Sequence, residues 1–133
     1  MKRIYVTHCS REKDSSLEQS GEKVTPDRLY TSTGLQRFIR HCNERGYDWA
    51  ILSDHYGVVF KDEPIAWYNK PPDSVTEEEF IELLRSFVTR LKPYDEIYFH
   101  HRASETHPVF SRIVNQAKEQ GLHVVEFSPE DPD

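Results

Sequence analysis

Asp48-Trp49-Ala50-Ile51-Leu52-Ser53 is the stretch of this sequence that decides its fold. This short apolar run, bounded by polar residues, is typical of a strand that is buried on both faces. The preceding segment, from about Ser32 or Thr33 to Arg45, predicts a helix that ends at Gly46, because its apolar residues recur every three or four positions. These apolar residues are Leu35, Phe38, Ile39 and Cys42. A helix that leads directly into a buried strand indicates an α/β protein.

The same alternation continues on both sides of this unit. Short β-branched and aromatic runs predict three more strands, which are Arg3–His8, Ile97–His100 and His123–Phe127. Two more helices are marked by their ends: one begins at a capping box of Thr76 and Glu79 and stops before Pro93, and the other begins at Thr106 and Pro108 and is ended by Gly121. Strands that alternate with helices form parallel units, so we expect a three-layer α/β sandwich with a mainly parallel four-stranded sheet.

Length and composition limit the domain organisation. The chain has 133 residues, which is enough for one domain, and we expect a single domain over residues 1–133 with a frayed acidic tail at 128–133. The formal net charge of -6 disfavours tight nonspecific binding to duplex DNA, although local basic pockets are still possible.

The cellular location is inferred from what the sequence lacks. There is no apolar run of roughly 20 residues and no apolar N-terminal signal, so we expect no membrane span. Cys9 and Cys42 are the only cysteines and do not form a CxxC pair, which fits a reducing compartment. The sequence therefore predicts a cytoplasmic protein.

Polar residues gather where the predicted strands end. His8, Cys9 and Ser10 follow the first strand, Ser53 to Gly57 follow the second, and His100 to Arg102 follow the third. The carboxyl ends of parallel strands form the ligand crevice of such sheets, so these residues are expected to converge there.

Cys9 is a candidate nucleophile because Lys13, four residues later, would lower the pKa of its thiol. The alternative is a small buried thiol beside the sheet. His55 and His100 are candidate proton shuttles or anion contacts, with a structural histidine as the alternative. The histidine spacing does not indicate a metal site, and no GxGxxG or P-loop motif is present, so we expect neither a metal nor a cofactor.

Several segments resemble a known family, and they lie between Ile4 and Tyr68. They are Cys9-Ser10-Arg11-Glu12-Lys13, Leu29-Tyr30-Thr31-Ser32, Leu52-Ser53-Asp54-His55-Tyr56-Gly57-Val58-Val59 and Tyr68. Their order and spacing resemble those of the corresponding segments in uncharacterised domains related to the YaaA peroxide-stress proteins. The Cys9-x3-Lys13 element also resembles one in archaeosine synthase, an enzyme that modifies a deazaguanine base in transfer RNA. Because the residues that follow this element differ from that enzyme, its chemistry is not carried over.

Two classes of function follow. In the first, the crevice binds or modifies a nucleobase or nucleotide-like ligand, with Cys9, Lys13 and Tyr56 as the catalytic candidates. Ligand contacts would come from the remaining candidates, which are Ser10, Arg28, Tyr30, Ser53, His55, Gly57, Tyr68, His100 and Arg102. In the second, the protein is a noncatalytic module that binds nucleic acid or another protein through its long loops. The sequence alone indicates no oligomeric state.

Overall fold

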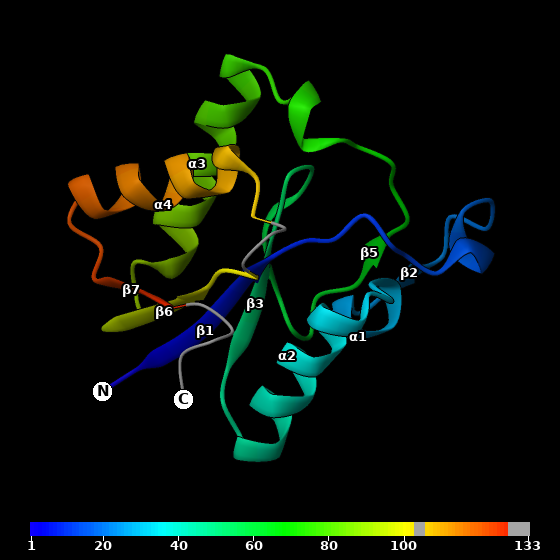
Figure 1. Ribbon diagram of the computed structural model, residues 1–133, viewed down its shortest axis with the longest axis horizontal. Coiled ribbons are helices and arrows are strands. Elements are labelled where there is room, and N and C mark those ends of the chain that lie inside the picture. The colour runs from blue at the N-terminus through cyan, green and yellow to red at the C-terminus, as the bar shows by residue number, and fades with distance from the viewer. Residues whose placement is uncertain (103–105, 128–133) are drawn as a thin grey trace.

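A central five-stranded sheet organises the computed structural model, which describes residues 1–102 and 106–127 (Figure 1). Its strand order is β4-β3-β1-β6-β7. Four strands run parallel to one another, namely β1 (Arg3–His8), β3 (Trp49–Ser53), β6 (Glu96–His100) and β7 (Val124–Phe127). The fifth, β4 (Gly57–Phe60), is antiparallel to β3 and lies at the edge of the sheet.

The α/β class is therefore confirmed, but the expectation of a mainly parallel four-stranded sheet was wrong, because the sheet is mixed and has five strands. The extra strand arises from a tight reversal after Ser53. Gly57 has a φ of 78°, a left-handed conformation that glycine adopts without steric cost. Val58 and Val59 then pair back onto β3. A strand of only four residues that directly follows a turn leaves little periodicity to detect.

The three long helices begin and end at recognisable caps. The Ser32 side chain caps α2 (Thr33–Arg45), and Gly46 ends it with a φ of 69°. The capping box of Thr76 and Glu79 opens α3 (Glu77–Leu91) as the sequence predicts. The helix α4 (Pro108–Glu119) is capped by His107 rather than by Thr106, with His107 Nδ1 accepting a hydrogen bond from the Val109 amide.

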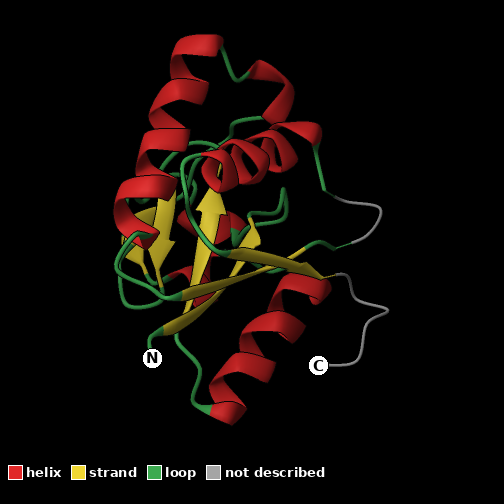
Figure 2. Cartoon of the chain, turned by 90° about the vertical axis from the view of Figure 1, so that its left-hand side faces the viewer, coloured by secondary structure: helices red, strands yellow, loops and turns green. Residues whose placement is uncertain are grey.

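The helices lie in two layers on opposite faces of the sheet (Figure 2). On one face, α3 and α4 pack together, and Phe110 of α4 stacks on His8 of β1 with 5.3 Å between ring centroids. On the other face, Phe38 of α2 lies 5.5 Å from His100 of β6. The fully buried core fills both interfaces and includes Ile4, Leu35, Ile51, Leu52, Phe87, Phe99 and Ile113.

The two long connections contain small elements of their own. Between β1 and α2 lie a 3-10 turn (Ser15–Leu17), β2 (Lys23–Val24) and α1 (Pro26–Leu29). Between β4 and α3 lie β5 (Ile65–Ala66) and a second 3-10 turn (Pro72–Ser74). Because β2 and β5 pair with each other, the two connections form one unit beside the main sheet (Figure 1).

The expectation of a frayed tail falls on residues 128–133, which lie outside the described residues. None of the helices in the described parts of the chain combines the length and the apolar character needed to cross a membrane.

Candidate functional site

A pocket of about 880 Å³ opens at the carboxyl ends of the parallel strands. The chain leaves β1 for α2 on one face of the sheet and leaves β6 for α4 on the other. A ligand crevice is expected at such a point, where neighbouring connections diverge. The pocket is lined by His8, Cys9, Ser10, Arg11, Glu12, Lys13, Ser32, Asp54, Asn69, Lys70, Pro71, Pro72, Asp73, Arg102 and Phe110.

Arg102 joins the ends of β1 and β6 at the base of the pocket. Its guanidinium donates hydrogen bonds to Thr7 Oγ1 at 3.1 Å and to the carbonyl oxygens of His8 at 2.8 Å and Cys9 at 3.2 Å. Arg102 is buried, with only 6% of the residue's surface exposed. Gly34 packs against it, and a Cβ at that position would lie 3.2 Å from Arg102 Cδ. Arg102 therefore fixes the geometry of the crevice.

Cys9 and Asp54 form a pair across the ends of β1 and β3. The Cys9 thiol donates to Asp54 Oδ1 at 3.6 Å. Burial, followed by the charge of Asp54, raises the pKa of Cys9 to about 12. Burial likewise raises the pKa of Asp54 above its usual value. The effect expected from Lys13 is present but is outweighed, so the thiol is protonated at neutral pH.

Lys13 lies half-buried between this pair and the tyrosines behind it. Its Nζ is 4.3 Å from the centroid of the Tyr68 ring and 5.8 Å from that of Tyr30. Burial lowers the pKa of the Lys13 ammonium, whereas the neighbouring Cys9 and Asp54 oppose that change. The lysine is thus a partly desolvated cation held against aromatic rings at the wall of the pocket.

Tyr30, Tyr68 and Ser53 form a buried hydrogen-bonded wall behind Lys13. The hydroxyl groups of Tyr30 and Tyr68 are 2.6 Å apart, and Ser53 Oγ donates to Tyr68 at 3.0 Å. Tyr30 is fully buried and Tyr68 is 7% exposed. Burial raises the pKa of both phenols well above the usual value. These tyrosines support the site from behind and do not line the pocket.

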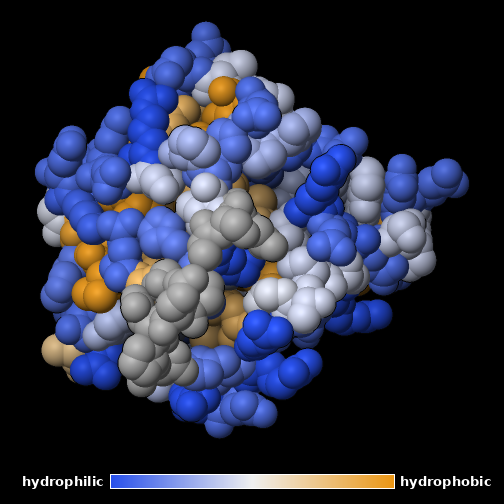
Figure 3. Space-filling view, in the orientation of Figure 1, coloured by the Kyte–Doolittle hydropathy of each residue, from blue (hydrophilic) through white to orange (hydrophobic). Residues whose placement is uncertain are grey.

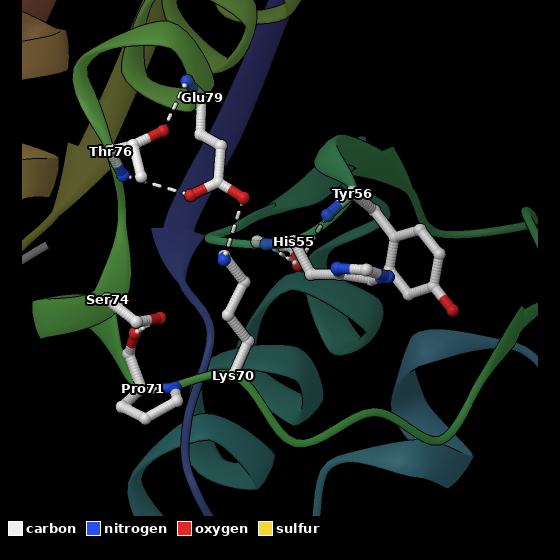
Figure 4. A network of polar contacts seen from close by, with 8 residues as sticks. His55, Tyr56, Lys70, Pro71, Ser74, Thr76 and Glu79 are labelled. Carbon is white, nitrogen blue, oxygen red and sulfur yellow. Dashed lines mark hydrogen bonds and ion pairs between the residues drawn. The ribbon is translucent and has the colours of Figure 1, made fainter.

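His55, Tyr56 and Gly57 lie on the far side of this wall. His55 stacks on Tyr68 with ring centroids 5.1 Å apart, and the Tyr56 hydroxyl donates to the Ala66 carbonyl oxygen. Figure 4 shows both side chains beside the loop that follows β3. Gly57 packs against α3, where a Cβ would lie 2.5 Å from Ser86 Oγ. The structure does not bring Tyr56 together with Cys9 and Lys13 in the pocket lining.

Among the other candidates, Ser10 lines the pocket, and its Oγ donates to the Glu12 carbonyl oxygen. Arg28 is exposed on α1. His100 lies on the face of the sheet that packs against α2, and its ring stacks on that of Phe127 with 4.8 Å between centroids. Four candidates therefore meet in the pocket, namely Cys9, Ser10, Lys13 and Arg102.

Asp54, Lys70 and Asp73 line the pocket but were not among the sequence candidates. Lys70 reaches from the proline-bearing loop to Glu79 Oε2 at 3.0 Å (Figure 4). Asp73 accepts from His107 Nε2 at 2.6 Å, which ties that loop to the start of α4. Asp54 lies within the Ser53 to Gly57 segment that the sequence places at the crevice, although the sequence assigns no role to it. Nothing in the local sequence signals that the loop carrying Lys70 and Asp73 folds over the pocket.

No group of three or more histidine, cysteine or acidic side chains is arranged to hold a metal ion within residues 1–102 and 106–127. The fold and the site define an α/β protein with a charged pocket at a strand-order switch point. No protein-family model, no curated protein and no solved structure matches this chain.

Proposed function

We propose that the pocket binds a nucleobase or nucleotide-like ligand. The observation that carries this proposal is the combination of cations, carboxylates and apolar walls in one cavity of about 880 Å³ at the switch point of the sheet. Small-molecule sites usually occupy about 300–1,000 Å³ and combine apolar walls with a few polar groups. The resemblance of the Cys9-x3-Lys13 element to one in archaeosine synthase, an enzyme that acts on a nucleobase, suggests the same class of ligand.

Each part of such a ligand has a chemical counterpart in the lining. Lys13 and Lys70 supply cations for an anionic group. Asp54 accepts hydrogen bonds, which suits the ring N–H and amino groups of a base. Pro71, Pro72 and Phe110 supply apolar surface for a planar ring. The buried Tyr30 and Tyr68 do not line the pocket, so these residues rather than the tyrosines would contact the ring.

Binding is supported more strongly than nucleophilic attack by Cys9. Its pKa of about 12 leaves almost no thiolate at neutral pH. A covalent step would first require Cys9 to lose its proton. We therefore propose ligand binding as the function of the pocket. Any reaction at Cys9 would require the ligand to change the contact between Cys9 and Asp54.

The experiment is a thermal-shift panel of nucleobases, nucleosides, nucleotides and short DNA or RNA strands at low and high salt. A ligand that binds only the folded state raises the melting temperature. We expect a salt-resistant shift with one small compound, lost in Lys13→Ala and Asp54→Asn. Lys23→Ala, at an exposed position on β2, is the control and should keep the shift.

If no small compound gives a shift that depends on Lys13 and Asp54, the proposal is wrong. A salt-sensitive shift with polymers alone would instead favour the noncatalytic interaction module.

A further inference from the structure

The helix α2 carries several arginines that form no ion pair with a carboxylate among residues 1–102 and 106–127. Its 13 residues include Arg37, Arg40 and Arg45 but only one acid, Glu44. All three arginines are exposed, and none forms an ion pair with a carboxylate in residues 1–102 or 106–127. Elsewhere, cations such as Arg112 and Lys118 pair with glutamates. Within the described part of this chain of net charge -6, one helix thus presents a basic surface without carboxylate partners.

Two of these arginines form a row with a histidine. Arg37, His41 and Arg45 follow one another at four-residue spacing, so their side chains lie on one side of the helix. Arg45 Nη1 and His41 Nδ1 are 2.9 Å apart. The row begins one turn after Gly34, which packs on Arg102 at the base of the pocket. It extends along a helix about 20 Å long toward the amino ends of the strands.

The row ends at a stack of tyrosine rings. Tyr47 follows α2, and its ring lies 6.3 Å from that of His41. Tyr47 stacks on Tyr5 with 4.4 Å between centroids and 8° between planes, and Tyr5 stacks on Tyr98 at 5.0 Å and 16°. All three rings are partly exposed. The surface over the lower end of α2 is predominantly hydrophilic (Figure 3).

We propose that this basic row and the adjoining tyrosine stack bind single-stranded nucleic acid. Proteins that bind single strands pair a cationic track for the phosphates with aromatic rings on which bases stack. Here the phosphates would lie along Arg37, His41 and Arg45, and bases would contact Tyr98 at the end of the stack. The surface lies outside the pocket lining, so this proposal does not rest on the pocket's ligand.

The tyrosines favour this partner over other polyanions. An acidic peptide or an anionic membrane would use the arginines, but neither offers planar rings to stack on the phenols. A duplex keeps its bases stacked within the helix, so it too would use only the arginines. Single strands should therefore bind more tightly than duplexes of the same length.

The test measures fluorescence anisotropy with labelled 12-nucleotide strands of DNA and RNA, using the full chain at about 50 mM salt. The variant Arg37→Gln/Arg45→Gln should weaken binding about tenfold and reduce the slope of log K against log salt by about 1.4, the value for two lost phosphate contacts. The matched control, Arg85→Gln/Lys92→Gln, removes two exposed cations, one in α3 and one at its C-cap, and should bind as the wild type does.

A second arm tests the stacking. Tyr98→Leu should weaken binding about fivefold or more, and Tyr98→Phe, which keeps the ring, should restore it. Neither change should alter binding of an abasic strand of equal length. Circular dichroism checks that each variant is folded.

Equal affinity of the wild type and the α2 variant would overturn the proposal, as would equal affinity for single and double strands. Binding of the α2 surface to anionic phospholipid vesicles with no affinity for strands would also overturn it.

Discussion

At Cys9, burial has a larger effect than the nearby charge of Lys13. Desolvation favours the neutral form of both side chains, so it raises the pKa of the thiol and lowers that of the ammonium. The sequence places the two residues four positions apart, which suggested a reactive thiolate. The structure adds Asp54, whose carboxylate accepts from the thiol and disfavours its ionisation.

The first prediction concerns the reactivity of Cys9. In a Cys42→Ala background, its reaction with a thiol reagent at pH 8 should be at least about a hundredfold slower than that of the same chain unfolded in urea. Asp54→Asn should speed the reaction, because it removes a negative charge beside the thiolate. Rates are measured by absorbance and the labelled site by mass spectrometry. A folded-state rate equal to that of the unfolded chain would contradict the pKa of about 12.

The second prediction concerns the tyrosine wall. Tyr68→Phe removes a hydroxyl that bonds Tyr30 at 2.6 Å and Ser53 at 3.0 Å, and it leaves both partners buried. The free energy of unfolding should fall by about 1–3 kcal/mol in urea titrations. Tyr56→Phe is the matched control, because its hydroxyl makes one exposed bond to the Ala66 carbonyl oxygen. Its loss should be below about 1 kcal/mol, and equal losses would mean that the wall contributes no special stability.

At the level of elements, the edge strand β4 depends on its first residue. Gly57 combines a φ of 78° with a contact to Ser86 that leaves no room for a Cβ. Ser86 Oγ also accepts from the Val58 amide at 3.1 Å, so α3 and β4 are joined at this point. The tight turn and the position of α3 are therefore specified together.

The third prediction follows from this contact. Gly57→Ala should lower the free energy of unfolding by about 2–4 kcal/mol, since it adds steric overlap to an unfavourable backbone conformation. Gly21→Ala has a similar φ of 67° but no atom within 4 Å of the added Cβ, so it should cost about 1–2 kcal/mol. Chemical denaturation of both variants gives the comparison. Equal losses would show that the contact with Ser86 relaxes freely.

The sequence predicted those elements that are marked by residues within the element itself. The four-residue apolar spacing and the caps of α2 and α3 lie within each helix, so their bounds could be derived. The strand β4 could not, because its four residues are recognisable as a strand only when paired with β3. Likewise, β2 and β5 have two residues each and exist through their pairing across about forty positions of the chain.

The candidate site divides in the same way. Cys9, Ser10, Lys13 and Arg102 follow strand ends, so topology alone brings them to one edge of the sheet. The burial of Tyr30 and Tyr68 depends on how the two long connections pack together, which no periodicity indicates. Lys70 enters the pocket for the same nonlocal reason.

At the scale of the whole molecule, His8 couples the pocket to stability. It is 1% exposed, stacks on Phe110, and its Nδ1 lies 3.2 Å from the Arg102 guanidinium. Burial, followed by the charge of Arg102, lowers the pKa of His8 to about 3. The folded protein therefore holds this imidazole neutral throughout the physiological range.

This burial predicts the sign of the acid response. Below a pH of about 6.5, the unfolded chain protonates His8, whereas the folded chain does so only near pH 3, so protons favour unfolding between these values. The contribution is complete above pH 6.5 and is lost as the pH falls, by up to about 1.4 kcal/mol per unit. The fall in unfolding free energy between pH 7 and pH 4, measured in urea, should be smaller in His8→Asn.

The raised pKa of Asp54 acts in the opposite direction but is common to both proteins. His123→Gln, at an exposed position, should follow the wild type. Parallel pH profiles for wild type and His8→Asn would mean that His8 is protonated in the folded state, and the arrangement of Arg102 beside a neutral imidazole would then be wrong.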